Sequence, residues 1–356
     1  MKKIILIFFA WALLILIINK FSVKFIPDRT SYELPEGINI EARFTLLPLL
    51  NFDGRNYLEI VRSGYTFRDG HNLQVFFPAY PFLIRIISSG GVINPVYLGL
   101  SISLISGLLS LIIFDKMFGL KAAILLFAFP TSFFFTAYYT ESIFLLFVLL
   151  FFFFLNKKKF AWASAFAALA SGTRIFGLAL TPVIIYEILK GGKSTRKHLW
   201  TAFIAPLGFL IYSLLSKNSI IFSQSDWNRN VGLLGPYYAI ADSLRHVFQG
   251  PQATYDSPFT YPVIILELII FIFTTLVVIK MYKKIDAKYF IYSAASLLII
   301  LLGGSLASSP RYILTIFPIF IYLAKYLKRY YYFYLTISLL LLVFFSTLFL
   351  RGYWVA

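Results

Sequence analysis

The chain consists mainly of long apolar runs that are separated by short and mostly basic segments. A helix needs about 20 apolar residues to cross the hydrocarbon core of a bilayer, within a range of roughly 17 to 25. Eleven runs approach this length, and we predict that each spans a membrane: 4–19, 95–114, 120–137, 141–155, 160–173, 175–189, 199–215, 259–280, 289–305, 311–325 and 332–350. The expected fold is an all-α polytopic membrane protein, in which residues 1–356 form a single transmembrane domain.

The composition excludes a soluble protein. Only 13% of the 356 residues are charged, whereas a soluble domain carries about 25%. The chain has no cysteine, which excludes disulfides, thiolate zinc ligands and a cysteine nucleophile. A net charge of +17 could indicate nucleic-acid binding, but such binding needs a clustered basic face. Because the basic residues lie in short groups between apolar runs, we expect no nucleic-acid partner.

The positions of the basic residues predict the orientation of the chain. Loops on the cytoplasmic side of a membrane carry an excess of Lys and Arg. With the N-terminus inside, the inner segments hold 18 of the 32 basic residues and two acids, Asp115 and Asp286. The outer segments hold the other 14 basic residues and 11 of the 15 acids. No small-residue cleavage site follows the first run, which we interpret as an uncleaved span and not a signal peptide.

Two outer segments, 20–94 and 216–258, are longer than a simple connection requires. The first contains an apolar stretch at 75–85 that is too short to span a bilayer and suits an interfacial helix. Counting it as a span would place the basic loop at 157–159 outside. Long segments of this kind usually carry function. We expect both to carry interfacial helices and to form the active-site face.

Three charged residues at the ends of predicted spans are not explained by the membrane. Charges are expensive in a bilayer, so those that remain indicate function. Glu141 begins a span with no basic residue nearby in the sequence, Arg174 separates two short spans, and Arg311 stands at the outer end of the tenth. All three are expected on one face. The alternatives are that Glu141 caps its helix and that the arginines extend to lipid headgroups.

The first long loop adds a carboxylate. Asp53 and Tyr57 are four residues apart, so they share a face if this segment is helical, and Gly54 leaves room beside the carboxylate. A carboxylate that faces arginines could take a proton from an acceptor hydroxyl while arginine binds an anionic leaving group such as a lipid phosphate. The simpler alternative is that Asp53 caps a helix or pairs with Arg55 or Arg62.

The histidines and most aromatic residues carry no specific signal. His71, His198 and His246 do not have the spacing of metal ligands. Trp227 and the 24 tyrosines are by default an aromatic belt at the membrane interface. We therefore expect no metal site.

Several motifs occur in order along the chain. They are FDGRNYLEIVRSGY at 52–65, FFPAYP at 76–81, PTSFFFTAYYTES at 130–142, TRIFG at 173–177, WNR at 227–229, PRY at 310–312, FP at 317–318 and the tail RGYWVA at 351–356. Together they resemble the PIG-V type of membrane mannosyltransferase, which belongs to the GT-C superfamily of glycosyltransferases. No single motif is specific, but the resemblance covers nearly the whole chain.

The resemblance implies a GT-C fold and a lipid-linked sugar donor, usually polyprenyl or dolichyl phosphate mannose, with no cofactor. Carried over by motif, Asp53 is the base on the acceptor hydroxyl. The residues expected to contact the donor and the acceptor are Tyr57, Glu141, Arg174, Trp227, Arg229, Arg311 and Tyr312. A leaving lipid phosphate needs charge stabilisation more than protonation, so the mechanism does not require a divalent metal. Phe52 stands where the family has a tryptophan, and it lacks the N–H donor of that residue. The resemblance therefore does not identify the acceptor substrate.

The expected function is transfer of a hexose, mannose by the resemblance, from a lipid phosphate to a hydroxyl of a glycolipid, glycan or protein, with inversion at the anomeric carbon. The chain has no Asn-x-Ser/Thr sequon, which favours a prokaryotic plasma membrane, with a cytoplasmic N-terminus, over the endoplasmic reticulum. One alternative is a transporter or lipid flippase, although those often show an internal repeat, and the sequence shows none. Another is a non-catalytic subunit of a partner transferase.

Overall fold

The computed structural model describes residues 2–29, 46–68, 71–90, 93–216, 229–252, 255 and 257–355, so Trp227 lies outside the described residues. The described chain is almost entirely helical. The α-helices are α1 (Lys2–Phe25), α2 (Asp53–Ser63), α3 (Ala79–Ser88), α4 (Pro95–Phe118), α5 (Leu120–Phe127), α6 (Glu141–Asn156), α7 (Phe160–Thr173), α8 (Leu180–Lys190), α9 (Lys193–Arg196), α10 (Leu207–Leu215), α12 (Gly235–Gln249), α13 (Thr260–Met281), α14 (Ala287–Leu302), α15 (Ser309–Ile313), α16 (Pro318–Tyr326) and α17 (Tyr331–Leu350).

Short elements connect these helices. Two strands, β1 (Phe67–Arg68) and β2 (His71–Asn72), form an antiparallel pair. The 3₁₀ segments are η2 (Leu47–Leu50), η3 (Leu73–Val75), η4 (Ser132–Phe135), η5 (Ile175–Ala179), η6 (Leu199–Phe203) and η7 (Lys328–Tyr330).

Four helical segments of the described chain are long and apolar enough to cross a membrane. They are α1, α4, α13 and the segment Lys328–Leu350, which contains α17. Between 33% and 44% of their apolar windows is buried inside the protein, so most of their apolar residues face outward. Such a surface is unfavourable in water and favourable in a bilayer. The prediction of an all-α membrane protein is confirmed, and the number of spans stays a prediction.

The remaining predicted spans are short or interrupted, and the segment 120–137 shows why. It begins as α5, which ends at Phe127, and continues as turns and η4. Pro130 has no N–H to donate and disfavours the helical conformation of the residue before it. Every residue from 125 to 140 is buried. Irregular backbone is tolerated at membrane depth where protein surrounds it, so this segment belongs to the interior of the bundle. Pro206 and Pro318 similarly stand where the predicted runs 199–215 and 311–325 are divided.

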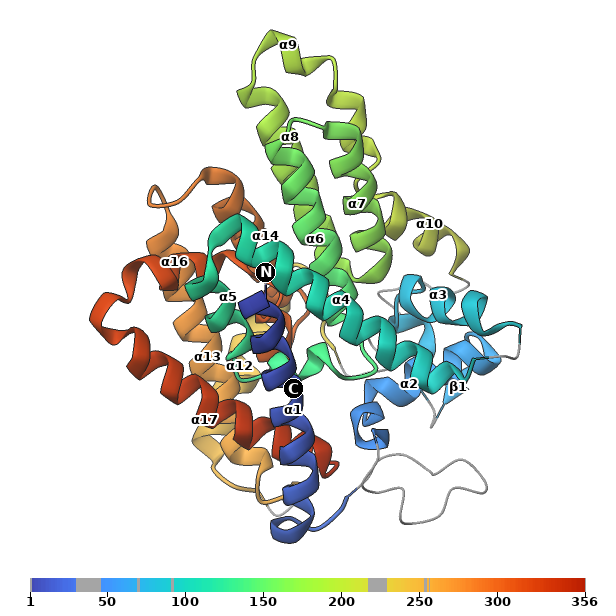
Figure 1. The fold of residues 1–356 in the computed structure, drawn as a ribbon, viewed down its shortest axis with the longest axis vertical. Helices are drawn as coiled ribbons and strands as arrows, with labels where there is room; N and C mark the ends of the chain where they lie inside the picture. The colour runs from blue at the N-terminus through green and yellow to red at the C-terminus, as the bar shows by residue number, and fades with distance from the viewer. Residues whose placement is uncertain are drawn as a thin grey trace.

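The first and last helices of the described chain pack against each other. In Figure 1, α6, α7 and α8 stand side by side at one end of the molecule, and α1 lies beside α17 in the other half. The Arg29 N–H donates to the carbonyl of Arg351 over 2.8 Å, and Arg351 Nε donates to the carbonyl of Ile26 over 3.0 Å. The tail after α17 is therefore held against the end of α1.

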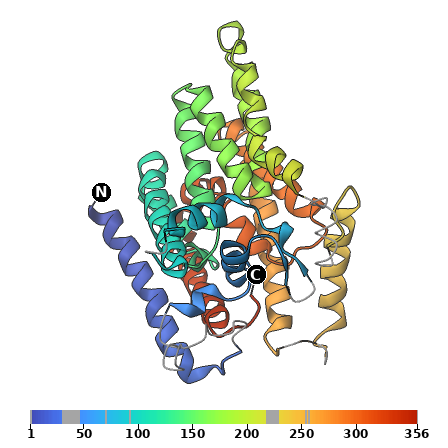
Figure 2. The ribbon, with the colours of Figure 1, turned by 90° about the vertical axis from the view of Figure 1, so that its right-hand side faces the viewer.

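Both long loops contain helices, and their place at the membrane interface stays a prediction. The apolar stretch at 75–85 lies largely in α3, which packs against α2 and α4. Tyr80 and Ile84 form its buried face, while Phe82 and Ile86 are exposed. The second loop contains α12, which lies beside α13 (Figure 2). The exposed side of α12 includes Phe248, as expected for an amphipathic interfacial helix.

Gly235 allows the start of α12 to lie directly against the end of α14. A Cβ atom at this position would lie 2.6 Å from the carbonyl oxygen of Leu302, which is closer than van der Waals contact permits. The same carbonyl accepts a hydrogen bond from the Gly232 N–H over 3.0 Å. These contacts hold the segment that begins at Arg229 against α14.

We expect Gly235→Ala to lower the free energy of unfolding by about 1–3 kcal/mol, because the added methyl group must displace packed backbone. Thermal unfolding of the detergent-solubilised protein measures this loss. Gly90→Ala is the matched control, since no heavy atom lies within 4 Å of a Cβ atom there. Equal melting temperatures for the two variants would contradict the packing described here.

Candidate active site

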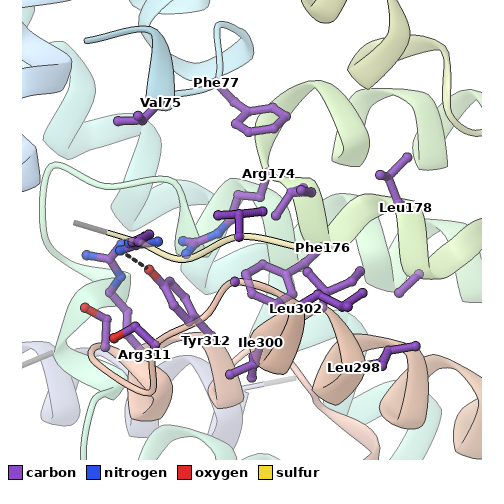
Figure 3. A pocket seen from close by; sticks show the side chains of 18 of the residues that line it. Val75, Phe77, Arg174, Phe176, Leu178, Leu298, Ile300, Leu302, Arg311 and Tyr312 are labelled. Carbon is purple, nitrogen blue, oxygen red and sulfur yellow. Dashed lines mark hydrogen bonds between the residues drawn. The ribbon is translucent and has the colours of Figure 1, made fainter. Parts of the chain in front are cut away.

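A cavity of about 670 Å³ brings most of the predicted site residues together. The arginines Arg174 and Arg311 lie at one end of it together with Tyr312, and Leu178 and Leu298 lie at the other end (Figure 3). The predicted residues that line it are Asp53, Tyr57, Arg174, Arg229, Arg311 and Tyr312. Glu141 contacts two of these side chains from the interior of the bundle.

Asp53 pairs with an arginine that is distant in the sequence. It is the first residue of α2, where the helix dipole stabilises a negative charge. Arg311, in α15, donates from Nη1 to Asp53 Oδ2 over 2.7 Å, across 258 residues of sequence. This ion pair joins the first long loop to the tenth predicted span, whereas sequence proximity had suggested Arg55 or Arg62.

Glu141 lies between two arginines. Its side chain is 0% exposed, and Oε1 forms an ion pair with Arg174 Nη1 and lies 3.0 Å from Arg311 Nε. Arg174 Nη1 also donates to Thr140 Oγ1 over 3.1 Å. The carboxylate therefore neutralises buried guanidinium groups instead of capping its helix, and both arginines point into the bundle instead of toward lipid headgroups.

A break in the helical backbone turns Arg174 toward the site. Arg174 lies between α7 and η5 with φ −155° and ψ 150°, which is an extended conformation. Three residues later, Gly177 lies so close to Ser171 that a Cβ atom would be 2.2 Å from the Ser171 backbone nitrogen. Only glycine allows the chain to fold back so tightly at this point.

Arg229 and Tyr312 complete the charged end of the cavity. Arg229 Nη2 donates to the Tyr312 hydroxyl over 3.1 Å, the bond that is drawn as a dashed line in Figure 3. The guanidinium carbons of Arg174 and Arg311 lie 5.4 and 5.3 Å from the centre of the Tyr312 ring. Two guanidinium groups therefore lie near the face of the tyrosine ring, which is favourable for its π system, and the third donates to its hydroxyl.

Among the described residues, the charges of this end do not cancel. Three arginines, Arg174, Arg229 and Arg311, face two carboxylates, Asp53 and Glu141, which leaves one positive charge in the described part of the site. Within the described part of the chain, no carboxylate lies within ion-pair distance of Arg229. An uncompensated charge is costly in an environment of low dielectric constant, so this end of the cavity favours an anion.

The other end of the cavity is apolar. Phe176, Leu178 and Pro182 line one side, and Leu298 and Leu302 of α14 line another. Leu298 is also 53% exposed, so the cavity reaches the molecular surface beside α14. The cavity is therefore suited to an amphiphile with an anionic head and an apolar tail.

Tyr57 lies on the same face of α2 as Asp53, as the spacing predicts. Its hydroxyl lies 3.5 Å from Thr140 Oγ1, and burial raises the pKa of Tyr57 well above its usual value, so the hydroxyl stays neutral. A Cβ atom at Gly54 would lie 3.4 Å from the Tyr138 carbonyl oxygen, an ordinary van der Waals contact, so this part of α2 packs directly on the buried 138–139 segment.

Trp354 is a cavity-lining residue that the sequence analysis did not assign. It lies edge-on to Phe52, with ring centres 5.5 Å apart, and it lines the cavity. In the sequence, only its place in the tail motif RGYWVA at 351–356 points to a role for Trp354. The contacts of Arg29 and Arg351 place it here, and these cannot be inferred from the tail alone.

The assignment of this site depends on its own geometry, because no family model, no curated protein and no solved structure matches the chain. The resemblance to PIG-V type mannosyltransferases stays a prediction from motifs.

We expect Glu141→Leu to lower the free energy of unfolding by about 3–5 kcal/mol, because it leaves two buried guanidinium groups without their shared carboxylate. Glu187→Leu is the control. The Glu187 side chain is 18% exposed and lies 3.8 Å from Lys190, which is 53% exposed, and a long pair with a solvent-exposed partner contributes about 0–1 kcal/mol. Chemical denaturation in detergent gives both values, and similar losses would contradict a central role for Glu141.

Proposed function

We propose that the protein is a glycosyltransferase that moves a hexose, mannose by the motif resemblance, from a polyprenyl- or dolichyl-phosphate donor to a hydroxyl acceptor on the extracytoplasmic face. One observation carries the proposal: a carboxylate and an excess of arginine lie together at one end of a cavity whose other end is apolar and open beside α14. A lipid-phosphate sugar has the matching parts, since it combines an apolar tail, a single phosphodiester charge and a polar sugar.

The arginines suit the phosphate of such a donor. A guanidinium group binds phosphate oxygens in pairs through its planar fork. The donor phosphate carries one negative charge, which matches the one positive charge in excess at this end of the cavity. When the bond to the sugar breaks, the lipid phosphate gains a second negative charge. The arginines therefore stabilise the transition state more than the bound donor, as catalysis requires.

Asp53 suits the role of general base. Arg311 contacts its Oδ2 atom, which leaves Oδ1 to accept the proton of the acceptor hydroxyl. The acceptor oxygen then forms a bond to the anomeric carbon, the bond from that carbon to the phosphate oxygen breaks, and the electron pair stays on the lipid phosphate. Because the acceptor attacks opposite the leaving group, the configuration at the anomeric carbon inverts.

We expect Asp53→Asn to lower kcat by about 10²–10⁴-fold, since the amide keeps the size of the side chain but cannot take a proton. The assay measures transfer of labelled mannose from decaprenyl-phosphate mannose to endogenous acceptors in membranes that contain each variant. Glu59→Gln is the control, because it changes the same charge on the same helix at a residue that does not line the cavity. Activity of the Asp53 variant near that of wild type would exclude Asp53 as the base.

We expect Arg229→Gln to raise the KM for decaprenyl-phosphate mannose about tenfold or more, because a hydrogen bond to a charged group contributes about 1.5–3 kcal/mol. Arg245→Gln, on the exposed side of α12, removes the same charge outside the cavity and serves as the control. An unchanged KM in the Arg229 variant would mean that Arg229 does not hold the donor phosphate.

The lateral opening beside Leu298 also suits a lipid flippase, which would bind the same amphiphile. A flippase moves a fluorescent polyprenyl phosphate between leaflets of proteoliposomes and yields no covalent product. Lipid translocation without mannose transfer would therefore favour this alternative.

A further inference from the structure

The two residues of the central ion pair each follow a turn in which a residue with a side chain has a positive φ angle. Phe52, directly before Asp53, has φ 57° and ψ −118°. Ser308, three residues before Arg311, has φ 67° and ψ 10°. Residues other than glycine adopt such conformations rarely, and they cluster at functional sites where the surroundings enforce them. The other such residues in the described chain are Lys158, Lys283 and Lys328, all of them in basic connections between helices.

The backbone around Phe52 has the geometry of a tight turn that glycine normally makes. The Gly54 N–H donates to the Asn51 carbonyl over 3.4 Å, and the φ and ψ of Phe52 match the first central position of a type II′ turn. Asn51 is itself fixed, because its Nδ2 donates to the Phe349 carbonyl over 2.8 Å.

A single hydroxyl group holds the peptide groups on both sides of Phe52. The Tyr139 hydroxyl donates to the Asn51 carbonyl over 2.7 Å and accepts from the Asp53 N–H over 3.1 Å. If Phe52 relaxed to a negative φ, these two groups would reorient and the hydroxyl would lose a partner. Tyr139 is 1% exposed and does not line the cavity, so it acts through Asp53 and not on a substrate.

A buried carboxyl group holds the second turn. Glu267 lies in the apolar helix α13 and is 5% exposed, and its Oε1 accepts from the Ser308 N–H over 2.7 Å. The Ser308 carbonyl in turn accepts from the backbone N–H groups of Arg311 and Tyr312 over 3.1 and 3.2 Å. A carboxyl group within a membrane-spanning helix is expensive and usually functional, yet Glu267 takes no part in the proposed reaction and does not line the cavity.

We propose that Tyr139 and Glu267 are positioning residues that hold Asp53 and Arg311 in their mutual orientation by fixing Phe52 and Ser308 in positive-φ turns. The two side chains come from different parts of the bundle and act before any substrate binds, which makes the site preorganised. The kinetic consequences rest on the proposed function, whereas the consequences for stability do not.

We call the hydrogen bonds of Tyr139 around Phe52 and of Glu267 to Ser308 the two clamps. Stability measurements test them without a substrate. Glycine adopts a positive φ at no steric cost, so a clamp has less to hold when glycine replaces the strained residue. We expect Tyr139→Phe to lower the melting temperature in the wild-type background and to lower it by less than half as much in the Phe52→Gly background. We expect the same relation between Glu267→Leu and Ser308→Gly. If the single variant Tyr139→Phe does not fold, its effect in the Phe52→Gly background can still be measured. This effect is the difference in melting temperature between the double variant and Phe52→Gly.

Tyr138 provides a matched control for Tyr139. It is the preceding residue and equally buried, but its hydroxyl has no hydrogen-bond partner within the described part of the chain. We expect Tyr138→Phe to have a smaller effect than Tyr139→Phe and to show no dependence on residue 52. The proposed role of Tyr139 would be overturned if the two tyrosine variants lowered the melting temperature equally. It would also be overturned if Tyr139→Phe had the same effect in both backgrounds.

Kinetics with decaprenyl-phosphate mannose separate positioning from a general structural role. We expect Tyr139→Phe to lower kcat tenfold or more with a donor KM within twofold of wild type, because it displaces the base. Glu267→Leu should also raise the donor KM, because Arg311 and Tyr312 follow Ser308. Glu267→Gln keeps an oxygen that can accept from Ser308 and should stay within threefold of wild type.

The possible failures are distinguishable. If Glu267→Gln is as damaging as Glu267→Leu, the hydrogen bond to Ser308 is not the role of Glu267 and that half of the proposal is overturned. If wild-type protein transfers no mannose, the proposed function fails, and the melting temperatures alone then support or overturn the two clamps.

Discussion

The sharing of one buried carboxylate by two buried arginines is the interaction on which the site depends. Guanidinium groups can be removed from water only when a partner neutralises them, and Glu141 does this for Arg174 and Arg311. Asp53 extends the network to the first long loop. The four residues lie at the beginning of α2, the beginning of α6, the junction of α7 with η5, and in α15. Segments that are far apart in the sequence therefore meet because their charges have no other favourable place in an apolar bundle.

The network also explains why the helices are interrupted where they are. Side chains at the ends of helices can converge on one point, whereas an unbroken span would spread them along its surface. The breaks beside Glu141 and Arg174 are possible because protein, and not lipid, surrounds the backbone there. The excess positive charge at Arg229 and the apolar lining near Leu298 then lie at opposite ends of one cavity, an arrangement that supports the proposal of a lipid-phosphate donor.

Much of the candidate site could be predicted from the sequence. The spacing of Asp53 and Tyr57 predicted a shared helix face, and the isolated positions of Glu141 and Arg174 predicted a common face of the bundle. The pairing could not be predicted, because Asp53 has two arginines nearby in the sequence and instead pairs with Arg311, 258 residues away. The clamps were also beyond prediction, since a positive φ at Phe52 follows from hydrogen bonds to Tyr139 and not from local propensity.

The sequence by itself determined that the protein is a helical membrane protein with its unexplained charges at the ends of apolar runs. Bilayer insertion depends on the length and composition of each run, and these are local properties that can be summed along the chain. Only the tertiary structure decided which carboxylate neutralises which arginine, which arginine has no carboxylate partner among the described residues, and which turns are strained. These features arise from contacts between distant segments, and their energies depend on burial and geometry that no single segment contains.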